Sequence, residues 1–534
     1  MKRLAFFLAS LATLVASSAH AARPKLVVLL VVDQMRADYI DSYGAAWKGG
    51  LHRLTTQGAY FTNAAYPYLQ TITCAGHATV STGSYPYAHG MVQNAWFDRA
   101  SGKSVTCTED AGKSLISYGT PVPGGDSAQR LLVPSLADEM RAQLFPAPRV
   151  VTLSLKARSA IMMAGHGGTS VAWTDGGALV TSRAFAQAPV PALTESLKRL
   201  PIAWDKVPAW TPLLPPKAYA FADDAPEEHS PSGWTRTFPH KLQGASVGET
   251  MANWTRSPYA DEYFGNLAIE MVKAMKLGQG PGADFLGVSF SVLDLVGHAY
   301  GPRSHEVQDV LARLDVTLGH LLAALDQAVG KNNYVVALTA DHGVSPLPEQ
   351  VTPTGVSAGR LPFARLKADL EAAIAKEVGG QNNVAAMVYT DLYLGRGVYG
   401  KLAAKPGALE RVLAAVRKVP GIAAAFAADQ LLTPKRSDGE LQYAAQLSYH
   451  PERSGDIVIV PAPYWIAADA GTTHGTANGY DQRVPIIFMG AGIKAGRQAR
   501  RVSPADIAPS LGHILGVTLS HADGEVLPEL QAAH

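Results

Sequence analysis

The sequence predicts an α/β fold with a mostly parallel central sheet, helices on both faces and inserted cap regions. Three observations support this prediction: several apolar, β-branched runs resemble strands buried on both faces, helical patterns lie between them, and the runs end on ionisable residues. In sheets of this kind, function gathers beyond the carboxyl ends of the strands. These strand ends are therefore where we expect the site.

The predicted strands share one feature, which is an apolar stretch followed at once by charged side chains. KLVVLLVVDQ ends at Asp33, VVTLSLKAR at Lys156 and Arg158, FLGVSFSVLD at Asp294, and NYVVALTADHG at Asp341 and His342. Runs that are apolar on both faces are typical of parallel strands covered by helices. Solvation alone does not explain why four such runs all end on ionisable residues.

Helical patterns separate the strands. Residues 310–327 place leucines three or four positions apart, which predicts a helix with one apolar face. SPADIAPSLGHILG, residues 503–516, opens with Ser503 as the expected N-cap before Pro504. We expect this second helix to pack on the sheet.

The chain divides into a signal segment and one long catalytic domain. Residues 1–21 have a basic start, an apolar middle and Ala-His-Ala before Ala22, which is typical of a cleaved secretory signal. We expect residues 22–534 to form a catalytic domain with insertions at about 170–282 and 345–470, which build a cap over the strand ends. The first insertion holds five of the eight tryptophans, which we interpret as cap core.

Charge and hydropathy exclude two classes of partner. Without Lys2 and Arg3 of the signal, the 46 basic residues fall to 44, which equals the 44 acidic residues. A balanced chain has no electrostatic footprint for nucleic acid. No later segment is apolar for the length of a bilayer span. We expect a monomer, periplasmic or secreted, that meets no membrane after signal cleavage.

Two cysteines, Cys74 and Cys107, remain in a chain that we expect to be exported. Oxidation is the default there, so the sequence favours a disulfide between them. Metal ligation is the alternative, although neither cysteine lies in a CxxC pair.

Six carboxylates and imidazoles lie at or near the predicted strand ends. They are Asp33, Asp294, His298, Asp341, His342 and His474. The DxxxH spacing of Asp294 and His298 places two donors about one helical turn apart, and this mixed oxygen and nitrogen donor set suits zinc. A single histidine is more often structural than a ligand, but six such residues together predict a site for two Zn²⁺ ions. Two zinc ions suit in-line displacement at phosphorus.

The segment TITCAGHATVSTG, residues 71–83, carries the candidate nucleophile. Its small residues suit a turn that leads into a helix, where free backbone N–H groups favour an anion such as phosphate. A threonine there is also an ordinary N-cap. The segment by itself leaves both interpretations open.

Taken together, the motifs VVDQ, TITCAGH, HGMVQNAWFD, KAR, LDLVGHAYGP, ADHG and THGT resemble the alkaline phosphatase superfamily. The resemblance is to the branch shared by bacterial zinc phosphate monoesterases and nucleotide pyrophosphatases/phosphodiesterases. It runs over most of the mature chain, and the combination is far more specific than any one motif.

The resemblance implies a role for each site residue. Thr73 would be the nucleophile and would form a phosphothreonine intermediate, and Asn94 would donate its amide to a phosphoryl oxygen. One zinc would be held by Asp294, His298 and His474, and the second by Asp33, Asp341 and His342 with Thr73 completing its shell. His77 would have a structural or supporting role.

Lys156 and Arg158 bear on the choice between monoesterase and diesterase. A monoester presents a dianionic phosphoryl group, so two extra cations gain more from it than from a diester. A KxR pair matches the related monoesterases. Diesterases of the family typically show Thr-Phe-Pro-Asn-His at the nucleophile, whereas this chain has Thr-Cys-Ala-Gly-His.

Three hypotheses follow. The first is a zinc-dependent alkaline phosphatase that acts on small phosphate monoesters. The second is a phosphodiesterase or nucleotide pyrophosphatase that uses the same two metals and nucleophile. The third is a non-catalytic periplasmic binding protein that has kept the fold.

Overall fold

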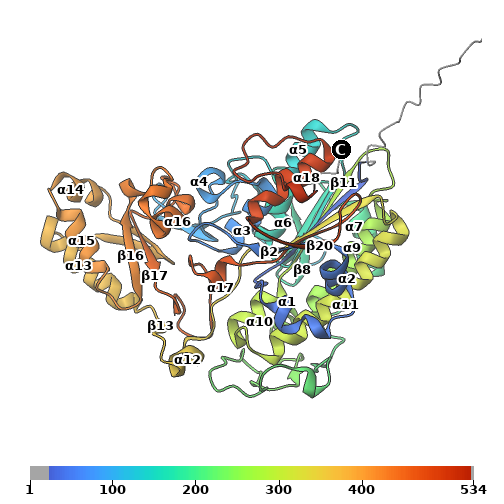
Figure 1. The fold of residues 1–534 in the computed structure, drawn as a ribbon, viewed down its shortest axis with the longest axis horizontal. Helices are drawn as coiled ribbons and strands as arrows, with labels where there is room; N and C mark the ends of the chain where they lie inside the picture. The colour runs from blue at the N-terminus through green and yellow to red at the C-terminus, as the bar shows by residue number, and fades with distance from the viewer. Residues whose placement is uncertain (1–22, 531–534) are drawn as a thin grey trace, which may run out of the picture.

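The structure, a computed structural model, describes residues 23–530, so the predicted signal segment lies outside the described residues. A ten-stranded sheet forms its centre (Figure 1). Its five middle strands run parallel to one another. In spatial order they are β12 (Tyr334–Thr339), β1 (Leu26–Val32), β11 (Asp284–Phe290), β6 (Val150–Ser154) and β7 (Ser170–Asp175). This confirms the α/β fold and the strands expected from the four apolar runs.

The flanks of the sheet are mixed. On one side β19 (Ile486–Gly490) is antiparallel to both β12 and β2 (Ala59–Ala64), and β20 (Gly496–Val502) closes the edge parallel to β2. On the other side β8 (Ala178–Ser182) is antiparallel to β7, and the edge strand β5 (Leu115–Ser117) is antiparallel to β8. β7 and β8 fall within the range expected for the first insertion, yet β7 pairs with β6 and β8 pairs with β7, so both belong to the main sheet. Most of their side chains are buried.

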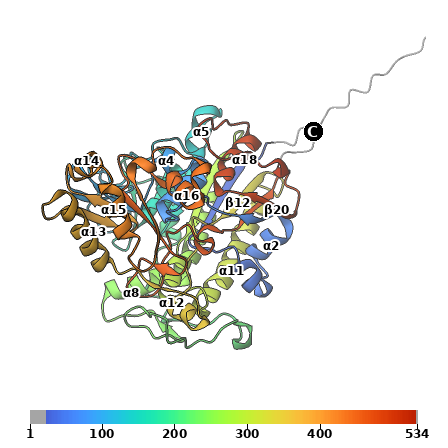
Figure 2. The same cartoon turned by 60° about the vertical axis from the view of Figure 1, so that its left-hand side comes forward.

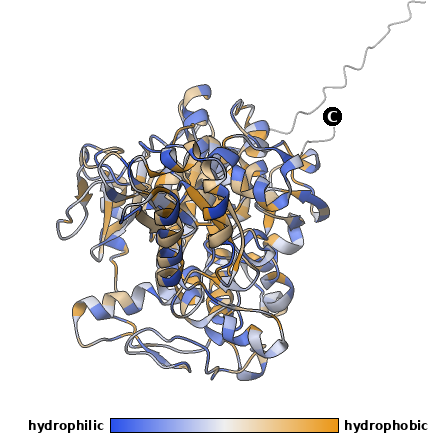
Figure 3. Cartoon of the chain, turned by 90° about the vertical axis from the view of Figure 1, so that its left-hand side faces the viewer, coloured by the Kyte–Doolittle hydropathy of each residue, from blue (hydrophilic) through white to orange (hydrophobic). Residues whose placement is uncertain are grey.

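Helices cover both faces of the sheet, and Figure 3 shows the apolar strands between them. One face carries α2 (Gly50–Gln57), α9 (Pro258–Ala274) and α11 (His305–Ala328). The other carries α3 (Thr73–Thr82), α5 (Leu136–Gln143), α6 (Ala157–Ala164) and α18 (Ile507–Leu515). The two predicted helices are thus confirmed as α11 and α18. Ser503 caps the 3₁₀ turn Pro504–Asp506 that leads into α18.

Residues 361–461 form a lobe beside the main sheet, drawn in orange tones in Figures 1 and 2. Its four-stranded sheet has the order β14 (Val384–Val388), β15 (Asp391–Leu394), β17 (Ile457–Pro461) and β16 (Ile422–Ala427). Helices α13 (Phe363–Val378), α14 (Val398–Ala404) and α15 (Ala408–Val416) pack with it around a separate apolar cluster.

The segment between β8 and α9 contains little regular structure. It includes α7 (Pro191–Arg199), β9 (Ala209–Trp210), β10 (His240–Lys241) and α8 (Val247–Thr255). Trp210 is fully buried, and its indole Nε1–H donates to Asp309 Oδ2 of α11 at 2.6 Å. Trp234 and Trp254 are also buried. These tryptophans are therefore core residues that pack the segment against the main body.

Candidate active site

Four neighbouring parallel strands deliver the predicted side chains to one edge of the sheet. Asp33 follows β1, Asp294 follows β11 and Lys156 follows β6, while Asp341 and His342 follow β12. Because parallel strands end at the same edge, residues far apart in sequence meet there. The alternation of apolar strand and charged end in the sequence is the cause of this convergence.

The six predicted metal ligands form two groups of three. One group is Asp294, His298 and His474, and the other is Asp33, Asp341 and His342. Within each group the ligand atoms lie within 4.8 Å of one another. Asp294 and His298 lie one turn apart on α10 (Val292–Tyr300), with His298 Nε2 3.2 Å from Asp294 Oδ1. His474 comes from a loop far along the chain, and its Nε2 is 3.6 Å from the same oxygen.

All three imidazoles have the same orientation. The Nδ1 atoms of His298, His342 and His474 lie 2.7, 2.9 and 2.8 Å from the backbone carbonyl oxygens of Thr472, Gly343 and Thr71. A carbonyl can only accept, so each Nδ1 carries the hydrogen, and each ring in its neutral form turns its Nε2 lone pair toward the carboxylates. This is the arrangement of metal-binding histidines.

The carboxylates in the second group lack sufficient partners within the protein. Asp33 Oδ1 and Asp341 Oδ2 are buried and accept no hydrogen bond from the residues that the structure describes. Burial, and then the negative charges of Asp294 and Asp341, raise the pKa of Asp33 well above its usual range. Buried carboxylates that face imidazole lone pairs are repulsive unless a cation lies between them. The residues present therefore fit bound divalent metal ions.

The two groups are adjacent. The rings of His342 and His474 stack with centroids 3.5 Å apart. Lys156 links the groups from the other side, because its Nζ donates to Asp33 Oδ2 and to Asp294 Oδ2, both at 2.6 Å. The Lys156 side chain is 10% exposed. A fixed positive charge thus lies between the two donor groups.

Thr73 is the first residue of α3, and its Oγ1 lies 3.4 Å from His342 Nε2. The N-cap is Ile72, in extended conformation, so Thr73 is not the capping residue. Gly76 permits this placement, since a Cβ there would collide with the backbone carbonyl of Asp341. The helix therefore approaches the Asp341 turn closely and directs Thr73 into the second donor group.

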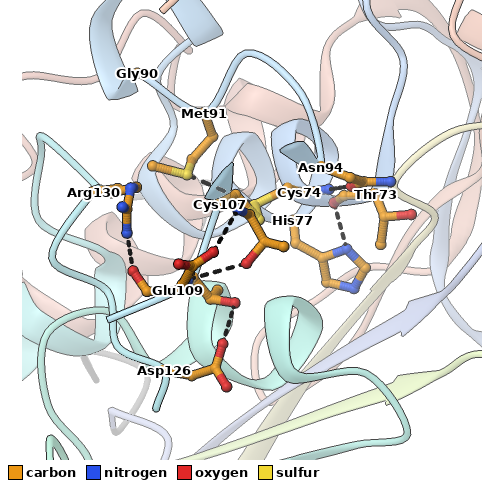
Figure 4. Close-up of a disulfide and its surroundings, with 12 residues drawn as sticks. Thr73, Cys74, His77, Gly90, Met91, Asn94, Cys107, Glu109, Asp126 and Arg130 are labelled. Carbon is orange, nitrogen blue, oxygen red and sulfur yellow. Dashed lines mark hydrogen bonds between the residues drawn. A yellow bond between two sulfur atoms is a disulfide. The ribbon is translucent and has the colours of Figure 1, made fainter. Parts of the chain in front are cut away.

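A disulfide joins Cys74 to Cys107 beside Thr73, as Figure 4 shows, and this confirms the favoured interpretation of the two cysteines. Asn94 lies in the same corner, and its side-chain Oδ1 accepts the Cys74 backbone N–H at 2.9 Å. Because the oxygen is used in this way, the amide presents its Nδ2 donors elsewhere. The amide is therefore anchored next to the start of α3.

Three further residues complete the surroundings. Arg158, in the first turn of α6, has a buried Nε with no partner in the described residues. His77 Nδ1 donates to the Thr73 carbonyl at 2.9 Å and lies 3.2 Å from Asp341 Oδ2, which supports the role expected for it. Gln34 was not predicted as a site residue. Its Nε2 donates to Asp294 Oδ1 at 2.7 Å and its backbone N–H to Asp341 Oδ1 at 3.1 Å.

Gln34 therefore connects the two donor groups from the strand that carries Asp33. It adopts φ +71°, which is unusual for a residue with a side chain. The motif VVDQ contains it, but this backbone conformation becomes visible only in the folded chain.

Comparison with known proteins identifies the family. The model of the type I phosphodiesterase / nucleotide pyrophosphatase family matches residues 27–481. Alkaline phosphatase PhoV of Synechococcus elongatus is 31% identical over 95% of this chain and 93% of its own length. Alkaline phosphatase PafA of Elizabethkingia meningoseptica is 30% identical over 95% and 94%.

Solved structures agree with this result. The crystal structure of PafA superimposes with a TM-score of 0.87 at 30% identity, covering 95% of this chain and 99% of PafA. A second PafA structure carries substitutions of a threonine, an asparagine, a lysine and an arginine. Murine ectonucleotide pyrophosphatase/phosphodiesterase 5 shares the fold, with a TM-score of 0.51 at 14% identity, covering 93% of this chain and 97% of its own. The chain belongs to the type I phosphodiesterase / nucleotide pyrophosphatase family of the alkaline phosphatase superfamily, and within it is similar to bacterial alkaline phosphatases.

Proposed function

We propose that this chain is a phosphoric monoester hydrolase, an alkaline phosphatase, that binds two Zn²⁺ ions and uses Thr73 as its nucleophile. The observation that carries the proposal is the position of Lys156, whose Nζ lies 2.6 Å from carboxylates of both donor groups. A phosphoryl group that spans the two groups meets this charge. A monoester dianion gains more from it than a diester does.

The donor sets support zinc in particular. Each group combines carboxylate oxygens with imidazole Nε2 atoms, which suits zinc better than magnesium, an ion that prefers oxygen alone. Asp294, His298 and His474 hold one ion, and Asp33, Asp341 and His342 hold the other. Bound zinc supplies Lewis acidity, which lowers the pKa of oxygens in contact with it.

The protein's own residues position the reaction. Thr73 Oγ1 attacks phosphorus in line, so that the P–Oγ1 bond forms as the bond to the leaving alcohol breaks. Water then attacks the phosphothreonine, which releases inorganic phosphate and restores the hydroxyl. Asn94 Nδ2, Lys156 Nζ and the Arg158 guanidinium are the donors proposed for the non-bridging phosphoryl oxygens.

The relatives support this assignment of residues. The four substituted residue types in the PafA variant are the same as Thr73, Asn94, Lys156 and Arg158. They occur in the same order and with the same spacing along the chain. This agreement favours a joint role for the four residues.

The cap and the cellular location are part of the proposal. We infer that the lobe at 361–461 and the segment between β8 and α9 form a cap around the space beyond the strand ends. The signal-like N-terminus, together with the disulfide, favours an exported enzyme, because disulfides persist in oxidising compartments. Between residues 23 and 530, none of the helices has both the length and the apolar character needed to cross a bilayer.

A substrate comparison tests the proposal against its alternative, a phosphodiesterase on the same site. Zinc-loaded protein is assayed with an aryl phosphate monoester and with the methyl diester of the same aryl group. We expect kcat/KM for the monoester to exceed that for the diester by several orders of magnitude. A preference for the diester would support the phosphodiesterase, and no turnover of either substrate would support a binding protein.

A further inference from the structure

A cavity of about 710 Å³ opens beside the donor group of Asp294, His298 and His474, and the reaction described above does not use it. It lies between the lobe and the loop that leads to His474. The lobe contributes Phe363 at the start of α13, Met387 in β14 and Tyr389, while α10 contributes His298. We call this space the side cavity.

The direction of the reaction connects the side cavity to the substrate. In-line displacement requires the leaving group to depart on the face of phosphorus opposite the nucleophile. Thr73 Oγ1 lies beside His342, and hence beside the group of Asp33, Asp341 and His342. The leaving oxygen must therefore point toward the other group, of which His298 is a member. The His298 side chain is 37% exposed, and the ring lines the side cavity.

The walls determine which alcohol fits. Phe363, Met387 and Tyr389 provide two aromatic rings and a thioether, and alanines line much of the remainder. Among the described lining residues, none carries a carboxylate, and Lys367 is the cation besides the imidazole. Such walls favour a flat apolar group, because aromatic rings and methionine sulfur pack well on aromatic faces. They offer few partners to a polyhydroxylated alcohol.

Tyr389 is held in an unusual backbone conformation at this position. It lies in the turn between β14 and β15 with φ +50°, a conformation that residues with side chains rarely adopt. Tyr389 is 37% exposed, and it lines the side cavity together with Phe363 and Met387. The turn thus places one aromatic side chain at the wall of the side cavity.

We propose that the side cavity is a leaving-group subsite, which binds the apolar and preferably aromatic alcohol portion of a phosphate monoester. The proposal rests on the proposed function, because it places the phosphoryl group between the two donor groups. It adds a substrate class, aryl phosphates and similar apolar monoesters, and names Phe363, Met387 and Tyr389 as its recognition residues.

The test compares two monoesters on the same variants. Phenyl phosphate and methyl phosphate are assayed with the wild-type enzyme, with the double variant Phe363→Ala/Tyr389→Ala, and with Tyr399→Ala. Tyr399 belongs to the same lobe but does not line the side cavity, so it is the matched control. We expect the double variant to lower kcat/KM for phenyl phosphate by about tenfold to a hundredfold. Methyl phosphate should lose far less, and the control should leave both values near wild type.

Equal losses on the two substrates would overturn the proposal, because they would show that the substitutions disturb the shared phosphoryl site. A second measurement does not depend on turnover. Binding of 1-naphthol, followed by saturation-transfer NMR, should be seen with wild type and Tyr399→Ala and be lost in the double variant. Failure of the proposed function would appear as a wild-type protein that hydrolyses neither ester. In that case too, equal naphthol binding by all three proteins would contradict the subsite.

Discussion

Two buried clusters of carboxylates and imidazoles in the described residues differ in how their donors are arranged. One is the pair of three-residue groups at the strand ends. The other consists of Glu228, His240 and Glu306, which pack between the segment after β8 and the start of α11. His240 and Glu306 are at most 1% exposed, and Glu228 is 6% exposed. Composition and burial alone do not distinguish the two clusters.

The hydrogen-bond partners of the imidazoles do distinguish them. At the strand ends, three Nδ1–H groups donate to backbone carbonyls and leave three Nε2 lone pairs free. In the second cluster, His240 Nε2 lies 2.8 Å from Glu306 Oε1, and its Nδ1 has no partner in the described residues. The His240 imidazole makes one hydrogen bond. Within the described part of the chain, three donor atoms converge in each strand-end group but not in this cluster. Convergence of lone pairs therefore indicates a metal site better than acidic composition does.

Charge is also balanced differently in the two clusters. Burial, and then the charge of Glu228, raises the pKa of Glu306 to about 9, and burial, followed by the charge of Asp223, raises that of Glu228 to about 8. Burial lowers the pKa of His240 to about 4. The second cluster is thus neutral at neutral pH. The strand ends instead keep Lys156 and carboxylates in direct contact, as a site that binds cations and anions requires.

Metal removal should have the largest effect and should separate the clusters most sharply. We expect metal-free protein to lose at least about a thousandfold in monoester turnover, since Lewis acidity at the nucleophile and the leaving group is lost together. Added zinc should restore activity at close to two ions per chain, measured by elemental analysis. Glu306→Gln should still bind two ions. Full activity with stoichiometric magnesium and no zinc would contradict the assignment.

Removal of the nucleophile should come next. Thr73→Ala should lower turnover by about a thousandfold or more, while most of the zinc remains bound, because the hydroxyl supplies the attacking oxygen but only one of several metal contacts. Thr73→Ser should keep measurable activity. Steady-state kinetics together with zinc content would decide this, and an alanine variant with near wild-type turnover would exclude Thr73.

Loss of the two cations should discriminate between substrates. Each charge-assisted contact in a preorganised site is worth about a hundredfold in rate. Lys156→Ala/Arg158→Ala should therefore lower kcat/KM for a monoester by several orders of magnitude and that for a diester far less. Both are measured on one preparation with its zinc content checked. Equal losses would mean that these residues serve the fold or the metals in general.

The smallest effect concerns stability and the second cluster. The folded pKa of Glu306, about 9, lies above its usual value of 4.5. The stability that this group contributes is therefore fully present below pH 4.5 and is lost as pH rises toward 9. Glu306→Gln removes this titration. The free energy of unfolding of wild type should therefore fall relative to that of the variant, by on the order of 1 kcal/mol per pH unit between pH 6 and 9.

Denaturant unfolding at several pH values measures this difference, with Glu227→Gln as a matched control on the partly exposed neighbour of Glu228. Parallel curves for wild type and Glu306→Gln would show that the second cluster does not titrate in this way.

Much of the fold and the site could be predicted because both depend on local patterns. The apolar runs specify the strands, and the residues directly after two of them are the donors Asp33, Asp341 and His342, since parallel strands share an edge. Features that depend on tertiary context could not be predicted. The conformation of Gln34, the contacts of Lys156 with two carboxylates and the turn that holds Tyr389 arise from segments distant in sequence. The sequence pattern did not predict the separate sheet of the lobe either, because its strands are short and partly exposed.

If Thr73 is the nucleophile, it carries the phosphoryl group during turnover, and this group can be detected on the enzyme. Zinc-loaded enzyme is mixed with an aryl phosphate monoester, quenched in acid at a series of short times, digested and examined by tandem mass spectrometry. We expect a phosphopeptide modified on Thr73 that forms before steady state and disappears as substrate is consumed. A phosphate on any other residue, or sustained turnover with no modified Thr73 at any quench time, would contradict it.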